Sequence, residues 1–366
     1  MIEYEKFRYY WEKGNPALCS ANPLPVPGIK NMNFKKPIAK FFGTRKSNLS
    51  VDWENVHSVL IRPIGTGLGD AVVLSAVCKQ LKNRFPQCRI GVIGCPRNRP
   101  VLENNPFIDV FVADNLFSAF FHRRKWQFFL DYRPTFTTYT ILFDYILSAT
   151  TVLCFQKHPK KHYSAQTVHN YDLYIDNLSA THLANSLSLT PWAMHCETVS
   201  YTLPPLPQQA LDKAHKLLSA CKNTVVFFPF GTDRKINPSE VTEIISQLEN
   251  HFGRQLVCLF PFDAAAYPIS NHPSVIYTGA LSTEVFMALI KQAPVLVSVD
   301  SAPVHLAAAY GTACAAIYDM RADNFVLFGP IAPTRSFRAT KLQAQNTLAD
   351  IPVAEIVSYI KAQLER

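Results

Sequence analysis

Two kinds of apolar pattern alternate along the chain. Short apolar runs bounded by glycine, proline or charged residues are typical of buried strands, whereas apolar residues at helical spacing are typical of helices. Strands that alternate with helices form parallel sheets. We expect strands at 56–62, 89–94, 108–112, 224–228, 255–260, 275–277, 295–299 and 313–318, and helices at 71–84, 208–221, 239–251, 282–291 and 303–310.

The alternation runs in two series, which the segment Pro204-Pro205-Leu206-Pro207 separates. Residues 1–50 are rich in aromatic residues, lysine and proline, and we interpret them as an extension. The sequence therefore predicts an N-terminal extension (1–50) and two Rossmann-like α/β domains (51–203 and 204–366). Two such domains place a ligand cleft between the carboxyl ends of their strands.

Targeting and redox features are few. The longest apolar stretch, Tyr139 to Phe155, is interrupted by Asp144, so we expect a buried or interfacial helix rather than a membrane span. The first 20 residues lack the pattern of a secretory signal, and the nine cysteines are scattered without a C-x-x-C pair. Scattered cysteines argue against a disulfide scaffold and a zinc site, so we expect a cytoplasmic protein.

The positive charge is concentrated in the first part of the chain. Residues 1–200 hold 23 Lys and Arg against 14 Asp and Glu, while residues 201–366 hold 13 of each. Such a field favours a large anionic partner or an anionic membrane face, although a solvated basic surface is the simpler alternative for any one cluster. A nucleic acid is the rival partner, but no zinc-finger, RRM-type or basic-zipper signature supports it. The clusters lie at Lys30 to Lys46, Arg97 and Arg99, Arg123 to Lys125, and Lys157 to Lys161.

A glycine-rich loop joins the first expected strand to its helix. Its sequence is Ile61-Arg62-Pro63-Ile64-Gly65-Thr66-Gly67-Leu68-Gly69-Asp70. The loop lacks the Gly-Lys-Ser/Thr of a P-loop and the glycine spacing of a dinucleotide fingerprint, and Asp70 would repel a phosphate. A carboxylate at the end of a strand suits a general base, with glycines that allow close approach of a substrate. The alternative is that Asp70 only caps its helix, and the sequence leaves both interpretations open.

The second domain holds the better anion site. The strand at 295–299 leads directly into a helix whose N-cap is expected at Ser301 or Ala302, with Pro303 at the first helical position. Free N–H groups of that first turn can bind a diphosphate. Asp300 could accept hydrogen bonds from sugar hydroxyls, and His305 could donate to a phosphate or simply be packed.

A third loop, at 229–238, opens at the same edge. Lys235 or Arg234 could neutralise a diphosphate, although Arg234 could equally pair with Asp233 at the surface. Asn237 and Glu240 form a plausible capping box for the next helix.

Together these motifs resemble glycosyltransferase family 9, the lipopolysaccharide ADP-heptosyltransferases. The resemblance spans about residues 56–330. It implies a two-domain GT-B fold and an inverting transferase that needs neither a metal nor another cofactor. It also implies that Asp70 is the general base and that Lys235 contacts the donor phosphates. The motifs that carry the resemblance are Ile61-Arg62-Pro63 with Gly67-Leu68-Gly69-Asp70, Asn104 to Asp109, Gly231 with Lys235, and Asp300-Ser301-Ala302-Pro303-Val304-His305-Leu306-Ala307-Ala308.

The donor site implied by the resemblance comprises Gly231, Lys235, Asp300, Ser301, Ala302 and His305. The family usually has Asp-Thr-Gly-Pro where this chain has Asp300-Ser301-Ala302-Pro303, and Trp-Pro where it has Ile236-Asn237-Pro238. The methyl group of Ala302 narrows the backbone's approach to a diphosphate. These departures leave the reaction type in place and weaken the assignment of heptose. The chain has no Asp-x-Asp, the usual carboxylate pair of metal-dependent glycosyltransferases.

The basic first domain is expected to meet the acceptor. The expected donor is ADP-heptose, and an anionic lipopolysaccharide inner core at the cytoplasmic face of the inner membrane would explain the charge. The segment at 34–46 could lie on that membrane or fold as a strap against the domain. Alternatives are another nucleotide sugar, a protein acceptor, a nucleic-acid-binding protein without transferase activity, or a non-catalytic scaffold, which would need neither Asp70 nor Lys235. The expected acceptor contacts are Gly67, Gly69, Arg97, Arg99, Arg133, Lys160 and Lys161.

Overall fold

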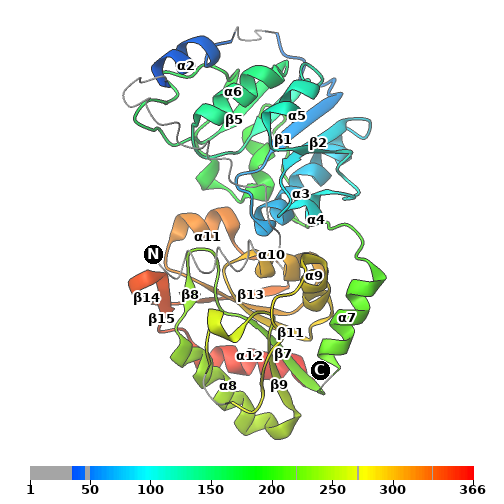
Figure 1. Cartoon of the computed structure of the whole chain (residues 1–366), viewed down its shortest axis with the longest axis vertical. Coiled ribbons are helices and arrows are strands. Elements are labelled where there is room, and N and C mark those ends of the chain that lie inside the picture. Colours follow the sequence, from blue (N-terminus) through cyan, green and yellow to red (C-terminus); the bar gives the residue numbers. More distant parts are fainter. Residues whose placement is uncertain (1–34, 46–49, 220, 270–271, 332) are drawn as a thin grey trace, which may run out of the picture.

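Two six-stranded parallel sheets form the framework of the protein (Figure 1). The structure is a computed structural model that describes residues 35–45, 50–219, 221–269, 272–331 and 333–366. The strand orders are β3-β2-β1-β4-β5-β6 and β10-β9-β7-β11-β12-β13, which is the same doubly wound order in both sheets. The expected α/β fold with two Rossmann-like units is confirmed, whereas the domain boundaries at 50 and 203 stay predictions.

The first sheet and its helices occupy the upper half of Figure 1. Its strands are short and β-branched or aromatic, and they are largely buried because helices cover both faces. The elements are β1 (Ser58–Arg62), α3 (Leu68–Arg84), β2 (Arg89–Gly94), α4 (Arg99–Leu102), β3 (Val110–Ala113), α5 (Leu116–Phe121), β4 (Phe128–Asp131), α6 (Thr138–Leu147), β5 (Thr151–Phe155) and β6 (Leu173–Ile175), followed by the 3₁₀ turns Leu178–Ala180 and Leu183–Leu189.

The second sheet occupies the lower half. Its central strands are buried except for the half-buried Phe228 at the end of β7, and a small third sheet of β8, β14 and β15 lies beside it. The elements are α7 (Gln208–Leu218), β7 (Asn223–Phe228), β8 (Lys235–Ile236), α8 (Pro238–Phe252), β9 (Leu256–Phe260), β10 (Val275–Tyr277), α9 (Thr283–Gln292), β11 (Val295–Val299), α10 (Ala302–Tyr310), β12 (Cys314–Tyr318), α11 (Ala322–Phe328), β13 (Thr334–Arg338), β14 (Lys341–Gln343), β15 (Thr347–Ala349) and α12 (Val353–Leu364).

All the expected strands and helices exist, with ends shifted by a few residues, but the stretch Tyr139 to Phe155 was predicted wrongly. It is not one helix: α6 ends at Leu147, its C-cap Ser148 adopts a left-handed conformation with φ of 50°, and β5 follows. β-branched residues in Thr151-Val152 favour the strand. No helix of the described ranges is long and apolar enough to span a bilayer.

The part of the extension that the structure describes folds against the first domain. Helix α2 (Lys35–Phe42) packs on α6 with Ala39 buried, and the Arg45 guanidinium lies 3.1 Å from the Asp172 carboxylate. In these residues the extension therefore folds as a strap against the domain. Residues 1–34 and 46–49, which include Lys30, Phe34 and Lys46, lie outside the described residues.

The two domains meet where the N-terminal ends of α3 and α10 cross. Gly69 allows this close approach, because a Cβ atom there would lie 3.1 Å from the Ala302 Cα and 3.2 Å from the His305 Cδ2. The apolar core continues across this contact and includes both helices. Both loops that open onto the cleft are therefore held by packed helices rather than by mobile connections.

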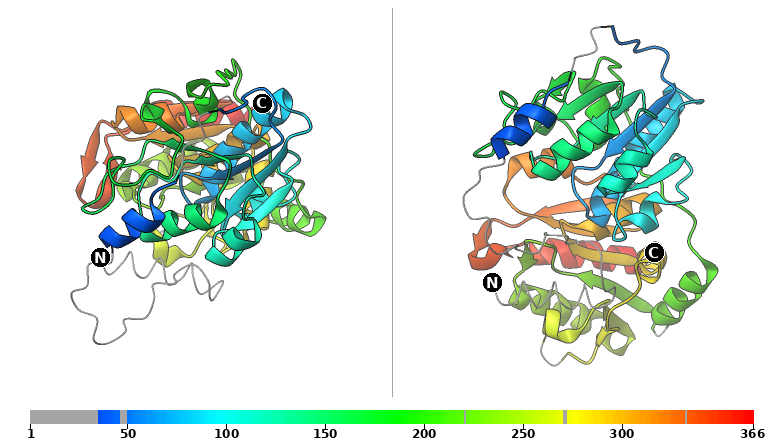
Figure 2. Two further views of the ribbon diagram at one scale, coloured as in Figure 1. Left: turned by 90° about the horizontal axis from the view of Figure 1, so that it is seen from above. Right: turned by 45° about the horizontal axis from the view of Figure 1, so that its top comes forward.

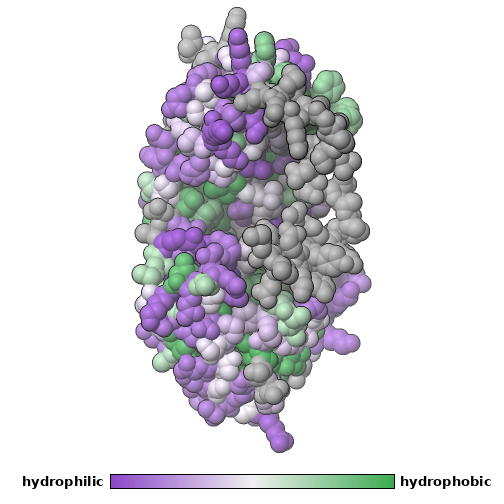
Figure 3. Space-filling model, turned by 60° about the vertical axis from the view of Figure 1, so that its left-hand side comes forward, coloured by the Kyte–Doolittle hydropathy of each residue, from purple (hydrophilic) through white to green (hydrophobic). Residues whose placement is uncertain are grey.

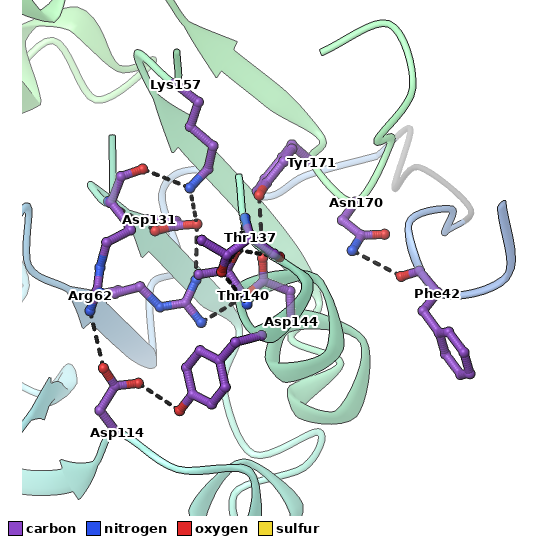
Figure 4. Close-up of polar contacts among 12 residues, drawn as sticks. Phe42, Arg62, Asp114, Asp131, Thr137, Thr140, Asp144, Lys157, Asn170 and Tyr171 are labelled. Atoms are coloured by element: carbon purple, nitrogen blue, oxygen red, sulfur yellow. Dashed lines mark hydrogen bonds and ion pairs between the residues drawn. The ribbon is translucent and has the colours of Figure 1, made fainter. Parts of the chain in front are cut away.

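A buried cluster of four charges braces the carboxyl end of the first sheet (Figure 4). The Asp131 carboxylate lies 3.0 Å from the Arg62 guanidinium and 2.7 Å from the Lys157 ammonium. The second nitrogen of Arg62 lies 2.8 Å from Asp144 on α6. Burial raises the pKa of Asp131, but Arg62 and Lys157 outweigh it and hold that pKa below its usual value. The cluster ties β1, β4 and α6 together, and its Arg62 immediately precedes the loop that ends in Asp70.

Candidate active site

A cavity of about 320 Å³ lies between the domains, where the carboxyl ends of the two sheets face each other. The first domain contributes the 67–70 turn and Arg97, and the second contributes the ends of β7, β9 and β11 with the start of α10. On the part of the surface shown in Figure 3 that grey atoms do not cover, hydrophobic residues gather at mid-height, with hydrophilic residues above and below. The expected cleft is present.

Asp70 lines this cavity and also caps its own helix. Its Oδ2 accepts a hydrogen bond of 3.0 Å from the Gly67 N–H. Side chains at Gly65 and Gly67 are excluded by the carboxylate itself, since a Cβ on Gly65 would overlap it and one on Gly67 would lie 2.9 Å from it. The glycines thus make room for Asp70, and Gly69 makes room for α10. The geometry shows the capping contact and places Asp70 on the cavity wall, while its role as a general base stays a prediction.

Asp70 is half-buried at the wall of the cavity, and this partial burial shapes its electrostatics. Burial raises its pKa above the usual value, against the opposing effects of the Gly67 N–H, Arg97 and Arg133. A carboxylate with a raised pKa is a stronger base than an exposed aspartate. The residue can therefore accept a proton from a hydroxyl group placed in the cavity.

The start of α10 forms the opposite wall. Ser301 is the N-cap, but its hydroxyl donates to the Val299 carbonyl oxygen at 2.9 Å instead of capping the first turn. Pro303 stands at the second helical position, one residue later than expected. Burial, with a smaller effect of His182, lowers the pKa of His305 to about 3, so its ring is neutral. The helix end, rather than a cationic histidine, supplies the positive potential.

Arg234 enters the cavity, and sequence reasoning had not preferred it. Its guanidinium lies 2.6 Å from Asp300 Oδ2, which also accepts a hydrogen bond of 2.7 Å from Asn324. Burial raises the pKa of Asp300 to about 6, against the opposing effect of Arg234. The alternative pairing with Asp233 is present as well, at 3.2 Å. Asp300 is therefore engaged within the protein and fixes Arg234 at the strand end.

Lys235 does not line the cavity. It pairs with Thr347 in the small sheet, while Gly231 of the same loop does line the cavity and packs close to Ser301. The expected capping box is wrong in its second half: Asn237 accepts from the Ser239 N–H, but Glu240 accepts from the Ile351 N–H instead of turning back to Asn237.

An aromatic wall was missed at the sequence level. Phe228, Phe230, Phe262 and Phe286 line the cavity, and the rings of Phe230 and Phe262 lie 4.7 Å apart. The signal was available: the tripeptide Phe-Pro-Phe occurs at 228–230 and again at 260–262. Because β7 and β9 are paired parallel strands, the two tripeptides emerge side by side.

Of the expected acceptor residues, Gly67 and Gly69 line the cavity, and the structure separates the basic ones into three groups. Arg97 lines the cavity, and Arg133, held by Asp114 at 3.0 Å, acts on Asp70 through its charge. Arg99 is exposed, pairs with Glu103 on α4, and does not line the cavity. Lys160 and Lys161 line a separate surface hollow beside the start of α6. Lys35, the first residue of α2, also lines this hollow.

Residues 247–350 match the model of glycosyltransferase family 9 (heptosyltransferase), which agrees with the resemblance noted from the motifs. Among curated proteins none matches the sequence. Solved structures are similar in fold at low sequence identity.

A family 9 glycosyltransferase from Veillonella parvula superposes with a TM-score of 0.64 at 13% identity, covering 85% of this chain and 98% of the other. The ADP-heptose lipopolysaccharide heptosyltransferase II of E. coli gives 0.64 at 13% identity, with 85% and 99% covered. The E. coli heptosyltransferase WaaC with ADP gives 0.52 at 13% identity, with 84% and 98% covered. These likenesses show the two-domain fold.

Proposed function

We propose that this chain is a family 9 glycosyltransferase that transfers a sugar from a nucleotide-sugar donor to an acceptor hydroxyl, with Asp70 as general base. The match of residues 247–350 to the family model supports the proposal. One observation carries the proposal. A half-buried carboxylate of raised pKa and the uncapped start of α10 line the same cavity from opposite domains. A base and an anion site so arranged suit a displacement in which a diphosphate leaves.

The proposed reaction is a single displacement. Asp70 takes the proton of the acceptor hydroxyl, the oxygen attacks the anomeric carbon, and the nucleotide diphosphate leaves with the bonding electrons. The N–H groups of the first turn of α10, with Arg234, stabilise the negative charge that develops on the leaving group. The proposal routes no step through a metal ion, because the chain's own positive groups face the leaving group.

The donor half of the cavity suits a nucleotide. The aromatic wall of Phe228, Phe230 and Phe262 offers apolar ring faces for a base, next to the phosphate-binding helix end. ADP-heptose is the first donor to test because two of the similar E. coli enzymes are heptosyltransferases described with ADP-heptose or ADP. A lipopolysaccharide inner core is the corresponding acceptor. Another nucleotide sugar or a protein acceptor is the alternative.

We expect ADP-heptose to raise the melting temperature of the protein and UDP-hexoses not to do so. A ligand at 100 times its dissociation constant stabilises the native state by about 2.7 kcal/mol. Thermal shift with a panel of nucleotide sugars, followed by release of free nucleotide in the presence of acceptor, is the measurement. A shift with a UDP-sugar alone would support transferase activity but would assign a UDP-sugar, rather than ADP-heptose, as the donor. Absence of any shift across the panel would contradict the nucleotide-sugar site.

The phosphate contacts can be assigned by two substitutions. Arg234 lines the cavity, whereas Lys235, the next residue of the chain, does not. We therefore expect Arg234→Ala to weaken ADP binding more than Lys235→Ala does. Loss of a charge-assisted hydrogen bond costs about 1.5–3 kcal/mol, or about 10-fold to 150-fold in affinity. Titration calorimetry with ADP measures both.

The exposed Lys222→Ala serves as the matched control and should bind ADP normally. A larger loss in Lys235→Ala would transfer the phosphate role to Lys235, as the motif resemblance implies, and would mean that its loop moves on binding. Unchanged affinity in both variants would contradict a basic contact to the phosphates.

A further inference from the structure

We propose that the outer face of α5 and the basic turn that follows it, together residues 116–125, dock on an anionic phospholipid bilayer. We call this surface the aromatic–basic face. It lies away from the cavity between the domains, and none of its residues lines that cavity. The inference extends the proposed function to a lipid-borne acceptor, but its evidence and its test are independent of transfer activity.

Helix α5 presents its large apolar side chains outward. Phe117, Phe120 and Phe121 are 72%, 61% and 53% exposed, whereas the small Ala119 is the buried residue of the helix. The rings of Phe117 and Phe121 lie 4.4 Å apart and those of Phe120 and Phe121 lie 6.0 Å apart. Three clustered, exposed phenylalanines are costly in water and mark an interaction surface. If these rings served the core of the domain, they would point inward, where only Ala119 is buried.

Basic residues directly adjoin the three rings. Arg123, Arg124 and Lys125 are all exposed, and Arg124 adopts a left-handed conformation with φ of 57°. Its N–H donates to the Leu147 carbonyl oxygen at 2.8 Å, which holds the turn against the end of α6. Residues 115–130 contain no Asp or Glu. Phenylalanines beside lysine and arginine complement the acyl region and the anionic headgroups of a membrane surface.

The same combination recurs on α2. Helix α6 packs against both α2 and α5, and Figure 2 shows the three helices in a row on one face of the first sheet. On α2, Phe41 is 67% exposed and Lys40 is exposed. Tyr145 of α6 is 46% exposed, and its ring lies 5.1 Å from that of Phe42 on α2. Rings and cations on two separate elements of one face favour an extended anionic and apolar partner. A bilayer engages the cations through its headgroups and the rings through its acyl region, whereas a double-stranded nucleic acid presents mainly its phosphates to the cations.

Docking through this face would turn the first domain toward the membrane and leave the second domain in the solution. The cavity with Asp70 would then lie at the side of the first domain that faces the second domain. The net positive charge lies in residues 1–200, which include the docking domain, and it would favour the same anionic membrane.

Vesicle flotation of the whole protein without substrates tests the proposal. We expect binding to phosphatidylcholine vesicles that contain phosphatidylglycerol, weak binding to phosphatidylcholine alone, and release by high salt. The triple variant Arg123→Gln, Arg124→Gln, Lys125→Gln should lose on the order of 100-fold in affinity, since each basic residue near an anionic surface contributes about fivefold. The matched control is Lys213→Gln, Lys216→Gln, Lys222→Gln, which removes three exposed charges from the second domain and should bind normally.

Insertion of the rings is tested separately from adsorption. In Phe120→Trp, brominated phospholipids should quench the introduced indole, and in Leu342→Trp, an exposed site of the second domain, they should not. Melting temperature and nucleotide release in solution should be unchanged in the charge variant, which shows that it folds. Equal vesicle binding by the charge variant and the wild type, or equal quenching at both tryptophans, would overturn the proposal. The proposal would also be overturned if the protein formed concentration-dependent dimers and the triple variant Phe117→Ser, Phe120→Ser, Phe121→Ser did not. The face would then bind a second copy of the chain. Salt-sensitive retention on DNA without vesicle binding would do the same in favour of a nucleic acid.

Discussion

Replacing Asp70 with asparagine is expected to lower turnover by about 10²–10⁴-fold while nucleotide binding persists, because general-base assistance is typically worth that factor. Asparagine is the appropriate substitute, since its side-chain oxygen can still accept the hydrogen bond from the Gly67 N–H. The fold of the loop is then preserved and only the proton acceptor is lost. Single-turnover rates and calorimetry with ADP separate the two effects.

The exposed Asp212→Asn on α7 is the matched control and should keep the full rate. Near-normal turnover in Asp70→Asn would remove Asp70 from the role of base. A loss of ADP affinity equal to the loss of rate would instead assign Asp70 to donor binding.

The same carboxylate sets a pH dependence. A base must be ionised to act, so the rate should rise with pH through the pKa of Asp70. Burial raises that pKa, so the ascending limb should lie above the range of an ordinary aspartate. The limb should be absent from Asp70→Asn. A limb at the usual aspartate pKa would mean that the residue is well solvated in the working enzyme.

Helix α10 was predictable because its signals are local. A strand, a small N-cap residue, a proline and a closing glycine follow one another within 295–311, and the structure reproduces each of them. The aromatic wall and Arg234 depend on which strands become neighbours. The pairing of β7 with β9 brings two copies of Phe-Pro-Phe together, and nothing within either copy states that the other lies beside it.

The glycine loop shows how a local motif can be recognised while its physical reason stays hidden. Its glycines suggested space for a substrate, but two of them give space to Asp70 and the third to the helix of the other domain. Basic residues were the least predictable group. Arg99 and Arg97 stand two positions apart, yet only Arg97 lines the cavity, because Arg99 lies at the start of a short helix and pairs with Glu103.

Replacing Arg62 with methionine is expected to destabilise the protein by about 3–5 kcal/mol, because removing one partner of a buried ion pair leaves charge without compensation. Asp131 and Asp144 would then share only Lys157. The pKa of Asp144 is already raised to about 6 by burial, against the opposing effect of Arg62. In the variant this pKa rises further, so the native state binds a proton that the unfolded state releases above pH 4. The loss of stability should therefore be smaller at pH 5 than at pH 7.

Arg84→Met is the matched control, since Arg84 makes a similar pair with Glu54 at 2.9 Å but with side chains 55% and 78% exposed. An exposed pair contributes about 0–1 kcal/mol, and this variant should stay within that range at both pH values. Urea unfolding of both proteins at pH 5 and pH 7 gives the four free energies. Equal small losses in the two variants would show that water reaches the cluster in solution. A large loss in Arg62→Met that did not grow with pH would mean that Asp144 stays charged without Arg62. Since β1 carries Arg62 immediately before the loop of Asp70, a variant that folds but turns over slowly would further identify this cluster as the support that holds the base in place.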